Sequence, residues 1–453
     1  MFSTSAMADA SATDLDATDI SARVRGGTFS ASEVARAHLD RHTEIDGILN
    51  AIIHLDRDVV LAHADAVDYM VAGGQHHLLP LAGVPVAIKD NIDVCGEVTS
   101  TGSRVHSNEP AAADAPVVAA LRNAGAVIFG RSNMDELAMG ASTQTSAFGP
   151  TRNPIDPRRS PGGSSGGAAA AVASAQVPLS VGTDTGGSVR EPSSQCGVFG
   201  LAPSPHLVSA TGVVPFMPSL DRVGPVARSA ADLALLLSVM AAKPELLQIR
   251  SVPASLRIGV VTELGNERNH PQIRAQLAAT QTLLESMGCI VQPISIPEAS
   301  RGLSIYMTLT TVACVPWLQP YVQTGRAGEE VVRRHAIGLE LTHTPRHRKA
   351  VLARRHLRRQ TRHALTRCDV LLSPTMPTVA PLLNGEISEQ EFADPMAAPY
   401  TDSWTVLANL TGLPALSVPV GRSDPSGLPF GMMLSGRPMR DATLLALGAA
   451  LTS

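Results

Sequence analysis

Pro161-Gly-Gly-Ser-Ser-Gly-Gly-Ala-Ala-Ala-Ala171 and Val181-Gly-Thr-Asp-Thr-Gly-Gly-Ser-Val-Arg-Glu-Pro-Ser193 are the two stretches that decide the fold. Their Gly/Ser clusters bracket an alanine-rich segment that predicts one tight helix over 168–175. Most Gly/Ser stretches are flexible linkers. These two lie within apolar sequence, where a loose loop would bury unpaired backbone polar groups. Because glycine lets the backbone approach another group closely, we expect the clusters to build a site.

Two kinds of site use such glycines. A phosphate-binding loop would continue to Gly-Lys-Ser/Thr or follow a strand with GxGxxG, and neither cluster does so. An acyl-transfer site needs a nucleophile, a base and backbone N–H groups aimed at an oxyanion. Ser188 follows two glycines and supplies the first and third of these. The clusters therefore favour acyl transfer over nucleotide binding.

No histidine lies near either cluster in the sequence, so the sequence gives little support for a histidine as the general base of such a site. Lysine is a known substitute for histidine in this role. Lys89 ends an apolar run over 81–89 that predicts a strand. Burial at that strand end would favour the neutral amine that a general base needs. The plain alternative is an exposed lysine at the end of a strand.

Helix and strand patterns alternate along the rest of the chain. Helices are predicted within 28–72 and at 117–124 and 271–287, and strands at 126–129, 256–261, 290–294, 369–372, 415–420 and 430–435. No repeat or convincing linker divides the chain. The predicted fold class is α/β, with a mixed central β-sheet covered by helices on both faces. We expect a single large domain over 21–453 after a disordered lead-in at 1–20.

Composition limits the partners and the compartment. The chain has 453 residues and a net charge of -4, and no basic block precedes an aromatic-rich stretch, so direct nucleic-acid binding is not expected. The basic run 346–362 is typical of a solvated helix face. Five scattered cysteines, no signal peptide and no apolar run of about 18 residues predict a soluble cytoplasmic protein without a membrane span. Its assembly is open, and a homodimer is one expectation.

The two clusters, with Cys196-Gly-Val-Phe-Gly-Leu201, resemble the amidase signature family. Val86-Ala-Ile-Lys-Asp-Asn91, Asn133-Met-Asp-Glu-Leu-Ala-Met-Gly140 and Ser219-Leu-Asp-Arg-Val-Gly-Pro225 extend the resemblance. It covers about 28–230 well, with a signature core at about 81–230, and 369–435 more loosely. The resemblance implies the amidase signature fold and hydrolysis of an amide without a metal or an organic cofactor.

The resemblance also implies roles for individual residues. Ser188 corresponds to the nucleophile, Ser164 to a bridging serine preceded by a cis peptide bond, and Lys89 to the lysine of a Ser-Ser-Lys triad. The oxyanion hole corresponds to the amides of Thr185, Gly186, Gly187 and Ser188. By the same resemblance, Asp184 and Arg190 brace this loop.

The substrate is less well defined by resemblance. The stretch 131–153 is most similar to the A subunit of glutamyl-tRNA(Gln) amidotransferase, and 394–414 echoes it. That similarity places Asp402 at a substrate ammonium and Arg358 at a carboxylate, although a loop carboxylate and an exposed helix arginine are the ordinary alternatives. The expected first contacts are Gly140 and Ser142. Weaker candidates for an apolar lining are Met139, Met217 and Trp317, each of which is more often simply core.

Departures from the amidotransferase pattern favour a free-standing hydrolase of a small carboxamide. After Leu201 the chain reads Ala-Pro-Ser-Pro where the family reads Lys-Pro-Thr, and 301–328 lacks an expected Arg-x-Asp-Gly segment. The alternative is a glutamine-hydrolysing A subunit of a tRNA-dependent amidotransferase, which would need partner chains. A third reading, a scaffold protein without catalysis, conflicts with the intact Lys89, Ser164 and Ser188.

Overall fold

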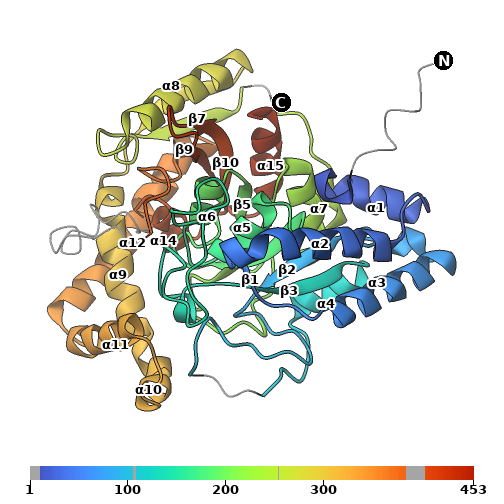
Figure 1. The fold of residues 1–453 in the computed structure, drawn as a ribbon. Helices are drawn as coiled ribbons and strands as arrows, with labels where there is room; N and C mark the ends of the chain where they lie inside the picture. The colour runs from blue at the N-terminus through green and yellow to red at the C-terminus, as the bar shows by residue number, and fades with distance from the viewer. Residues whose placement is uncertain (1–10, 106–108, 254, 384–402, 453) are drawn as a thin grey trace.

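The computed structural model describes residues 11–105, 109–253, 255–383 and 403–452. These residues contain one sheet of 11 strands in the order β1-β3-β2-β4-β6-β5-β10-β11-β9-β7-β8 (Figure 1). The strands are β1 Ile52–His54, β2 Pro85–Lys89, β3 Val127–Ser132, β4 Leu179–Asp184, β5 Phe199–Ala202, β6 Arg222–Ala227, β7 Arg257–Val261, β8 Ile290–Ile294, β9 Val370–Pro374, β10 Ala415–Arg422 and β11 Pro429–Gly436.

Helices surround the sheet. In chain order they are α1 Ala17–Arg25, α2 Ala31–Leu49, α3 Arg57–Ala72, α4 Pro116–Asn123, α5 Gly166–Ala173, α6 Arg190–Cys196, α7 Ala230–Met240, α8 Pro271–Ser286, α9 Gly302–Ala313, α10 Val315–Gln323, α11 Glu329–Leu341, α12 Pro345–Arg367, α14 Val406–Thr411 and α15 Asp441–Ala450. Short 3₁₀ turns stand at Ala12–Asp14 (η1), His76–Leu78 (η2), Glu136–Ala138 (η3), Pro244–Leu247 (η4) and Pro297–Arg301 (η5). Among the described residues, no helix is both long enough and apolar enough to cross a bilayer.

The sheet is mixed, as predicted. Strand β2 runs parallel to β3 and β4, and β7 runs parallel to β8 and β9. The remaining pairs are antiparallel, including the predicted hairpin of β10 and β11, in which Leu416 faces Leu434. Strands from both ends of the chain therefore share one sheet. This arrangement confirms the predicted fold class.

The positions of two neighbouring residues on β5 show that helices cover both faces of the sheet. Gly200 lies against the Ser193 side chain of α6, whereas the Phe199 ring lies against Gly448 of α15. Successive strand residues point to opposite faces of a sheet. Helices α6 and α15 therefore cover opposite faces, and the core is buried between each helix layer and the sheet.

The start of the chain corrects one prediction. A disordered lead-in was expected over 1–20, but α1 begins at Ala17, and Ile20 is fully buried. The N–H groups of Ala17 and Thr18 donate to the Asp232 carboxylate at 2.9 and 3.0 Å. This capping by a distant residue fixes the segment, and the Ser/Ala/Asp-rich composition of the segment gives no sign of it. Residues 1–10 lie outside the described part of the chain.

Three connections bring the signature residues to the middle of the sheet. Strand β2 ends at Lys89, α5 begins two residues after Ser164, and the loop 185–189 joins β4 to α6. Because β2 and β4 are adjacent parallel strands, their carboxyl ends meet at the same edge. Helix α5 packs against both strands. The fold thus places segments that are far apart in the sequence at one point.

Candidate active site

A buried lysine and two serines form the centre of the site. Lys89 Nζ lies 2.7 Å from Ser164 Oγ and 2.8 Å from Ser165 Oγ. It also lies 3.4 Å from the carbonyl oxygen of Thr183. Lys89, Ser164 and Ser165 are fully buried, so water does not reach these contacts. The peptide bond between Gly163 and Ser164 is cis, as the resemblance implied.

Ser188 stands beside this cluster. The Ser165 N–H donates to the Ser188 carbonyl oxygen at 3.1 Å, which joins the two signature loops through their backbones. Within the described residues, the Ser188 hydroxyl and the Ser164 hydroxyl do not form a hydrogen bond. Catalytic hydrogen bonds are often long without substrate and tighten when it binds. Ser188 is 4% exposed and Ser164 is 0% exposed, so Ser188 is the more accessible of the two.

The loop 185–188 presents a row of backbone donors. In the part of the chain that the structure describes, the N–H groups of Thr185, Gly186, Gly187 and Ser188 donate to no protein acceptor. Four consecutive N–H groups without a protein acceptor are free to donate to the oxyanion of a substrate. A side chain at Gly186 would collide with Tyr306, since an added Cβ would lie 2.5 Å from the ring. The loop can therefore approach α9 only with glycine at this position.

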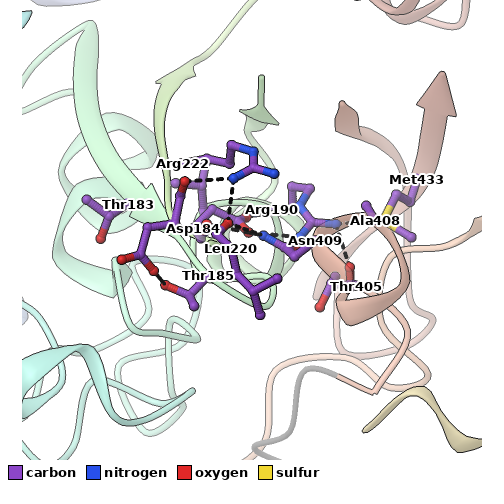
Figure 2. Close-up of polar contacts among 12 residues, drawn as sticks. Thr183, Asp184, Thr185, Arg190, Leu220, Arg222, Thr405, Ala408, Asn409 and Met433 are labelled. Atoms are coloured by element: carbon purple, nitrogen blue, oxygen red, sulfur yellow. Dashed lines mark hydrogen bonds and ion pairs between the residues drawn. The ribbon is translucent and has the colours of Figure 1, made fainter. Parts of the chain in front are cut away.

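A buried ion pair holds the two ends of this loop together (Figure 2). Arg190 and Asp184 form two hydrogen bonds, Nη2 to Oδ1 at 2.8 Å and Nε to Oδ2 at 3.0 Å. Asn409 Nδ2 donates to Asp184 Oδ1 at 2.9 Å, and Arg190 Nη2 donates to Asn409 Oδ1 at 2.6 Å. Burial raises the pKa of Asp184, but Arg190 and Asn409 outweigh it and hold the pKa below its usual value. The geometry fits the bracing role predicted for Asp184 and Arg190.

Replacing Arg190 by methionine is expected to destabilise the protein by about 3–5 kcal/mol, because it leaves the Asp184 carboxylate buried without its cation. Urea unfolding measures this change. Arg158→Met is the matched control, since Arg158 pairs with Asp156 at the surface, where such pairs contribute about 1 kcal/mol or less. Equal losses in the two variants would contradict the bracing role.

A second carboxylate, Asp135, holds the neighbouring loop. It accepts hydrogen bonds from the N–H groups of Ser142 and Thr143 at 3.1 and 2.8 Å and from the Thr145 hydroxyl at 2.9 Å. Burial raises the pKa of Asp135, and these hydrogen bonds oppose the rise. An added Cβ at Gly140 would lie 2.4 Å from the Asp135 carboxyl carbon. The predicted contacts Gly140 and Ser142 thus lie around Asp135, next to the signature loop.

Arg358 and Met217 lie on a separate hollow. With Leu309, Arg354 and Arg355 they line a pocket of about 350 Å³ between α9 and α12. Arg358 is exposed on α12. The structure therefore brings Arg358 and Met217 together in a pocket that none of Lys89, Ser164 and Ser188 lines.

Trp317, Met139 and Asp402 are the remaining predicted contacts. Trp317 Nε1 donates to the Phe216 carbonyl at 3.2 Å, one residue before Met217, and Met139 is buried in the core. Asp402 lies outside the described residues. Met139 belongs to the same hydrophobic cluster as Phe216, and Met217 and Trp317 pack against that cluster.

Three residues near the site were not given a role from the sequence. Ser165 contacts the lysine, Tyr306 lies on the glycine of the 185–188 loop, and Asp221 accepts a hydrogen bond from the Thr185 hydroxyl at 2.7 Å. Ser165 could have been found as the second hydroxyl of the first cluster. Tyr306 and Asp221 meet the site only through tertiary packing.

Comparison with known proteins agrees with this geometry. A model of the family described as Amidase matches residues 33–445. The A subunit of the glutamyl-tRNA(Gln) amidotransferase of Acidothermus cellulolyticus is 37% identical, over 96% of this chain and 93% of that protein. Among solved structures, a chain from a complex called vestigial, in work on the origins of an s-triazine catabolic enzyme, has a TM-score of 0.87. It is 31% identical, over 97% of this chain and 98% of that one. The 6-aminohexanoate cyclic dimer hydrolase has a TM-score of 0.85 at 27% identity, with 97% and 96% covered.

The fold and these relatives define an amidohydrolase that acts on amide C–N bonds. The chain belongs to the Amidase family.

Proposed function

We propose that this protein hydrolyses a small carboxamide through an acyl-enzyme on Ser188, with Ser164 and Lys89 transferring the proton. The observation that carries this proposal is the buried hydrogen bond of 2.7 Å between Lys89 Nζ and Ser164 Oγ, next to a loop with four free N–H donors. A lysine held in this way can supply the base, since among the described residues no histidine is hydrogen-bonded to Ser164, Ser165 or Ser188.

The first half of the reaction forms an ester bond. Ser188 Oγ attacks the amide carbonyl carbon as its proton passes to Ser164 Oγ, while the Ser164 proton passes to the neutral amine of Lys89. The carbonyl oxygen becomes an oxyanion, and the N–H groups of 185–188 stabilise it, at roughly 3 kcal/mol for each donor. As the C–N bond breaks, Lys89 returns a proton through Ser164 to the leaving nitrogen.

The second half regenerates the enzyme. Water attacks the ester carbon as one of its protons passes through Ser164 to Lys89. The bond to Ser188 then breaks as Lys89 returns that proton through Ser164 to Ser188 Oγ. The products are a carboxylate and ammonia or an amine. Every proton in this scheme moves between the substrate, water and the three side chains, so no metal or organic cofactor takes part.

The substrate side of the proposal rests on Gly140, Ser142, Arg358 and Asp402 as contacts. The Arg-lined pocket of about 350 Å³ is of a size that suits a small substrate. Two of the similar solved proteins are described as an amidase and as a 6-aminohexanoate cyclic dimer hydrolase, which supports a hydrolase.

Ammonia or amine release from a panel of primary amides, N-substituted amides, ureides and esters tests this proposal with the purified chain. Turnover of at least one amide, without any added protein, is the expected result. The absence of turnover across the panel, together with no labelling by a fluorophosphonate probe, would overturn it.

A second candidate is the glutamine-hydrolysing component of an amidotransferase, which the 37% identity to such a protein favours. It predicts that glutamine hydrolysis rises sharply when partner chains and charged tRNA are added. Co-purification of partner chains distinguishes the two candidates.

A further inference from the structure

Asp221 joins two parts of the site that lie far apart in the sequence. Its carboxylate accepts a hydrogen bond of 2.7 Å from the Thr185 hydroxyl, and Thr185 begins the row of free N–H donors. The same carboxylate accepts from the N–H groups of Met217 at 3.0 Å and Phe216 at 3.1 Å. One side chain therefore ties the donor loop to the segment 216–217.

The carboxylate is held by hydrogen bonds and not by a direct ion pair. The neighbouring Arg222 donates hydrogen bonds from Nη1 to the carbonyl oxygens of Leu220 and Asp221, at 2.9 and 2.8 Å. In the described part of the chain, no cation pairs with the Asp221 carboxylate. Burial raises the pKa of Asp221, and the hydrogen bonds from Thr185, Met217 and Phe216 oppose that rise. The hydrogen bonds from the Phe216 and Met217 N–H groups to Asp221 would be enough to hold the turn 216–221. The additional hydrogen bond from the Thr185 hydroxyl is not needed for that turn, so it calls for a separate explanation.

The segment 216–217 lines two hollows, one of which also contains Thr185 of the donor loop. Phe216 lines a small cavity together with Thr183, Thr185 and Asn91, and Met217 lines the Arg-bearing pocket between α9 and α12. The Phe216 carbonyl accepts a hydrogen bond from Trp317 Nε1 at 3.2 Å. This segment ends the stretch 202–217, in which the sequence departs from the family pattern. The segment 216–217 therefore belongs to a part of the chain in which this protein differs from that pattern.

We infer that Asp221 is a positioning residue that sets the oxyanion donor Thr185 and couples its position to the pocket segment 216–217. The inference rests on the proposed function, because it takes the N–H groups of 185–188 as the oxyanion hole. A substrate that packs on Met217 shifts the Met217 N–H, which donates to the same Asp221 carboxylate that orients Thr185. Filling of the pocket is thereby linked to the alignment of the donor.

Thr185→Val tests the link with the least disturbance, since valine keeps the shape and the backbone N–H but loses the hydroxyl. A displacement of about 1 Å at a reacting group can cost about 100-fold. We expect kcat for the best amide to fall about 10- to 100-fold with KM within about threefold. Affinity for a boronic acid that mimics the tetrahedral intermediate falls in parallel, while affinity for the carboxylate product stays the same. Thr185→Ser, which keeps the hydroxyl, is expected to restore most of kcat.

Asp221→Asn, combined with Thr185→Val, gives a double-mutant cycle. It disturbs both Thr185 and the segment 216–217, so kcat falls and KM rises, and adding Thr185→Val to Asp221→Asn costs little more. Thr361→Val is the matched control, because Thr361 is buried on α12 and its hydroxyl has no partner among the described residues. Thermal unfolding and fluorophosphonate labelling report whether each variant is folded.

An unchanged kcat in Thr185→Val, or equal losses in kcat and in ground-state affinity, would overturn this inference and leave the proposed function standing. Fully additive losses in the double variant would also overturn it. A wild-type chain that neither releases ammonia nor is labelled would overturn the inference and the proposed function together.

Discussion

Ser188→Ala is expected to lower kcat for amide hydrolysis by at least about 10⁴-fold, because it removes the atom that forms the acyl bond. The residual rate would come from the N–H groups of 185–188, which still bind the carbonyl oxygen. Ammonia release under substrate saturation measures the loss. KM should change little, since the serine hydroxyl contributes little to ground-state binding.

Ser180→Ala is the matched control for this variant. Ser180 lies on β4, eight positions before Ser188, is fully buried, and donates to the Ala87 carbonyl at 3.0 Å. It removes a hydroxyl of the same size outside the proposed site, so activity should be retained. A Ser188→Ala protein that keeps more than a few per cent of wild-type kcat would show that another group forms the covalent bond.

Lys89→Met is expected to lower amide turnover by about 10²- to 10⁴-fold and ester turnover much less. The amine leaving group must receive a proton, which Lys89 supplies through Ser164 at 2.7 Å, whereas an activated phenolate leaves without one. Methionine fills most of the volume of the buried lysine and avoids the cavity that Lys89→Ala would create. Parallel assays of a matched amide and nitrophenyl ester measure the loss of amide turnover relative to the loss of ester turnover.

Lys243→Met, which removes a half-exposed lysine near Glu245, serves as the control. It should leave both activities unchanged. Equal losses on the amide and the ester in Lys89→Met would argue that the lysine holds the structure of the site and does not deliver the proton.

The sequence predicted the centre of the site better than its surroundings. Lys89 could be found because its apolar strand is buried between two parallel neighbours, which leaves a continuous apolar run in the sequence. Ser188 became a candidate because two glycines precede it, whereas Ser164 was assigned through the resemblance of its cluster to the family. Each of these signals is local.

The rest depended on contacts between distant segments. Strand β4, Leu179–Asp184, was not predicted because its last residues belong to a Gly-rich motif that resembles a loop. Helix α1 was missed because a distant carboxylate, Asp232, caps it. Tyr306 lies 118 positions after Ser188, and no local pattern ties it to the site. Asp221 lies in the family-like motif 219–225, but the motif gives it no role by itself.

The substrate contacts remain predictions for the same reason. Gly140 and Ser142 lie around Asp135, and Arg358 is exposed on α12 beside other arginines. The signature residues carry the chemistry common to the family, so they do not specify which amide is bound.

The most direct measurement is localisation of the covalent adduct after reaction of the wild-type protein with a fluorophosphonate. Trypsin cuts after Arg159 and Arg190, so one peptide, 160–190, contains Ser164, Ser165 and Ser188. Tandem mass spectrometry is predicted to place the whole added mass on Ser188. An adduct on Ser164 or Ser165, or no adduct on this peptide, would contradict the assignment of Ser188 as the nucleophile.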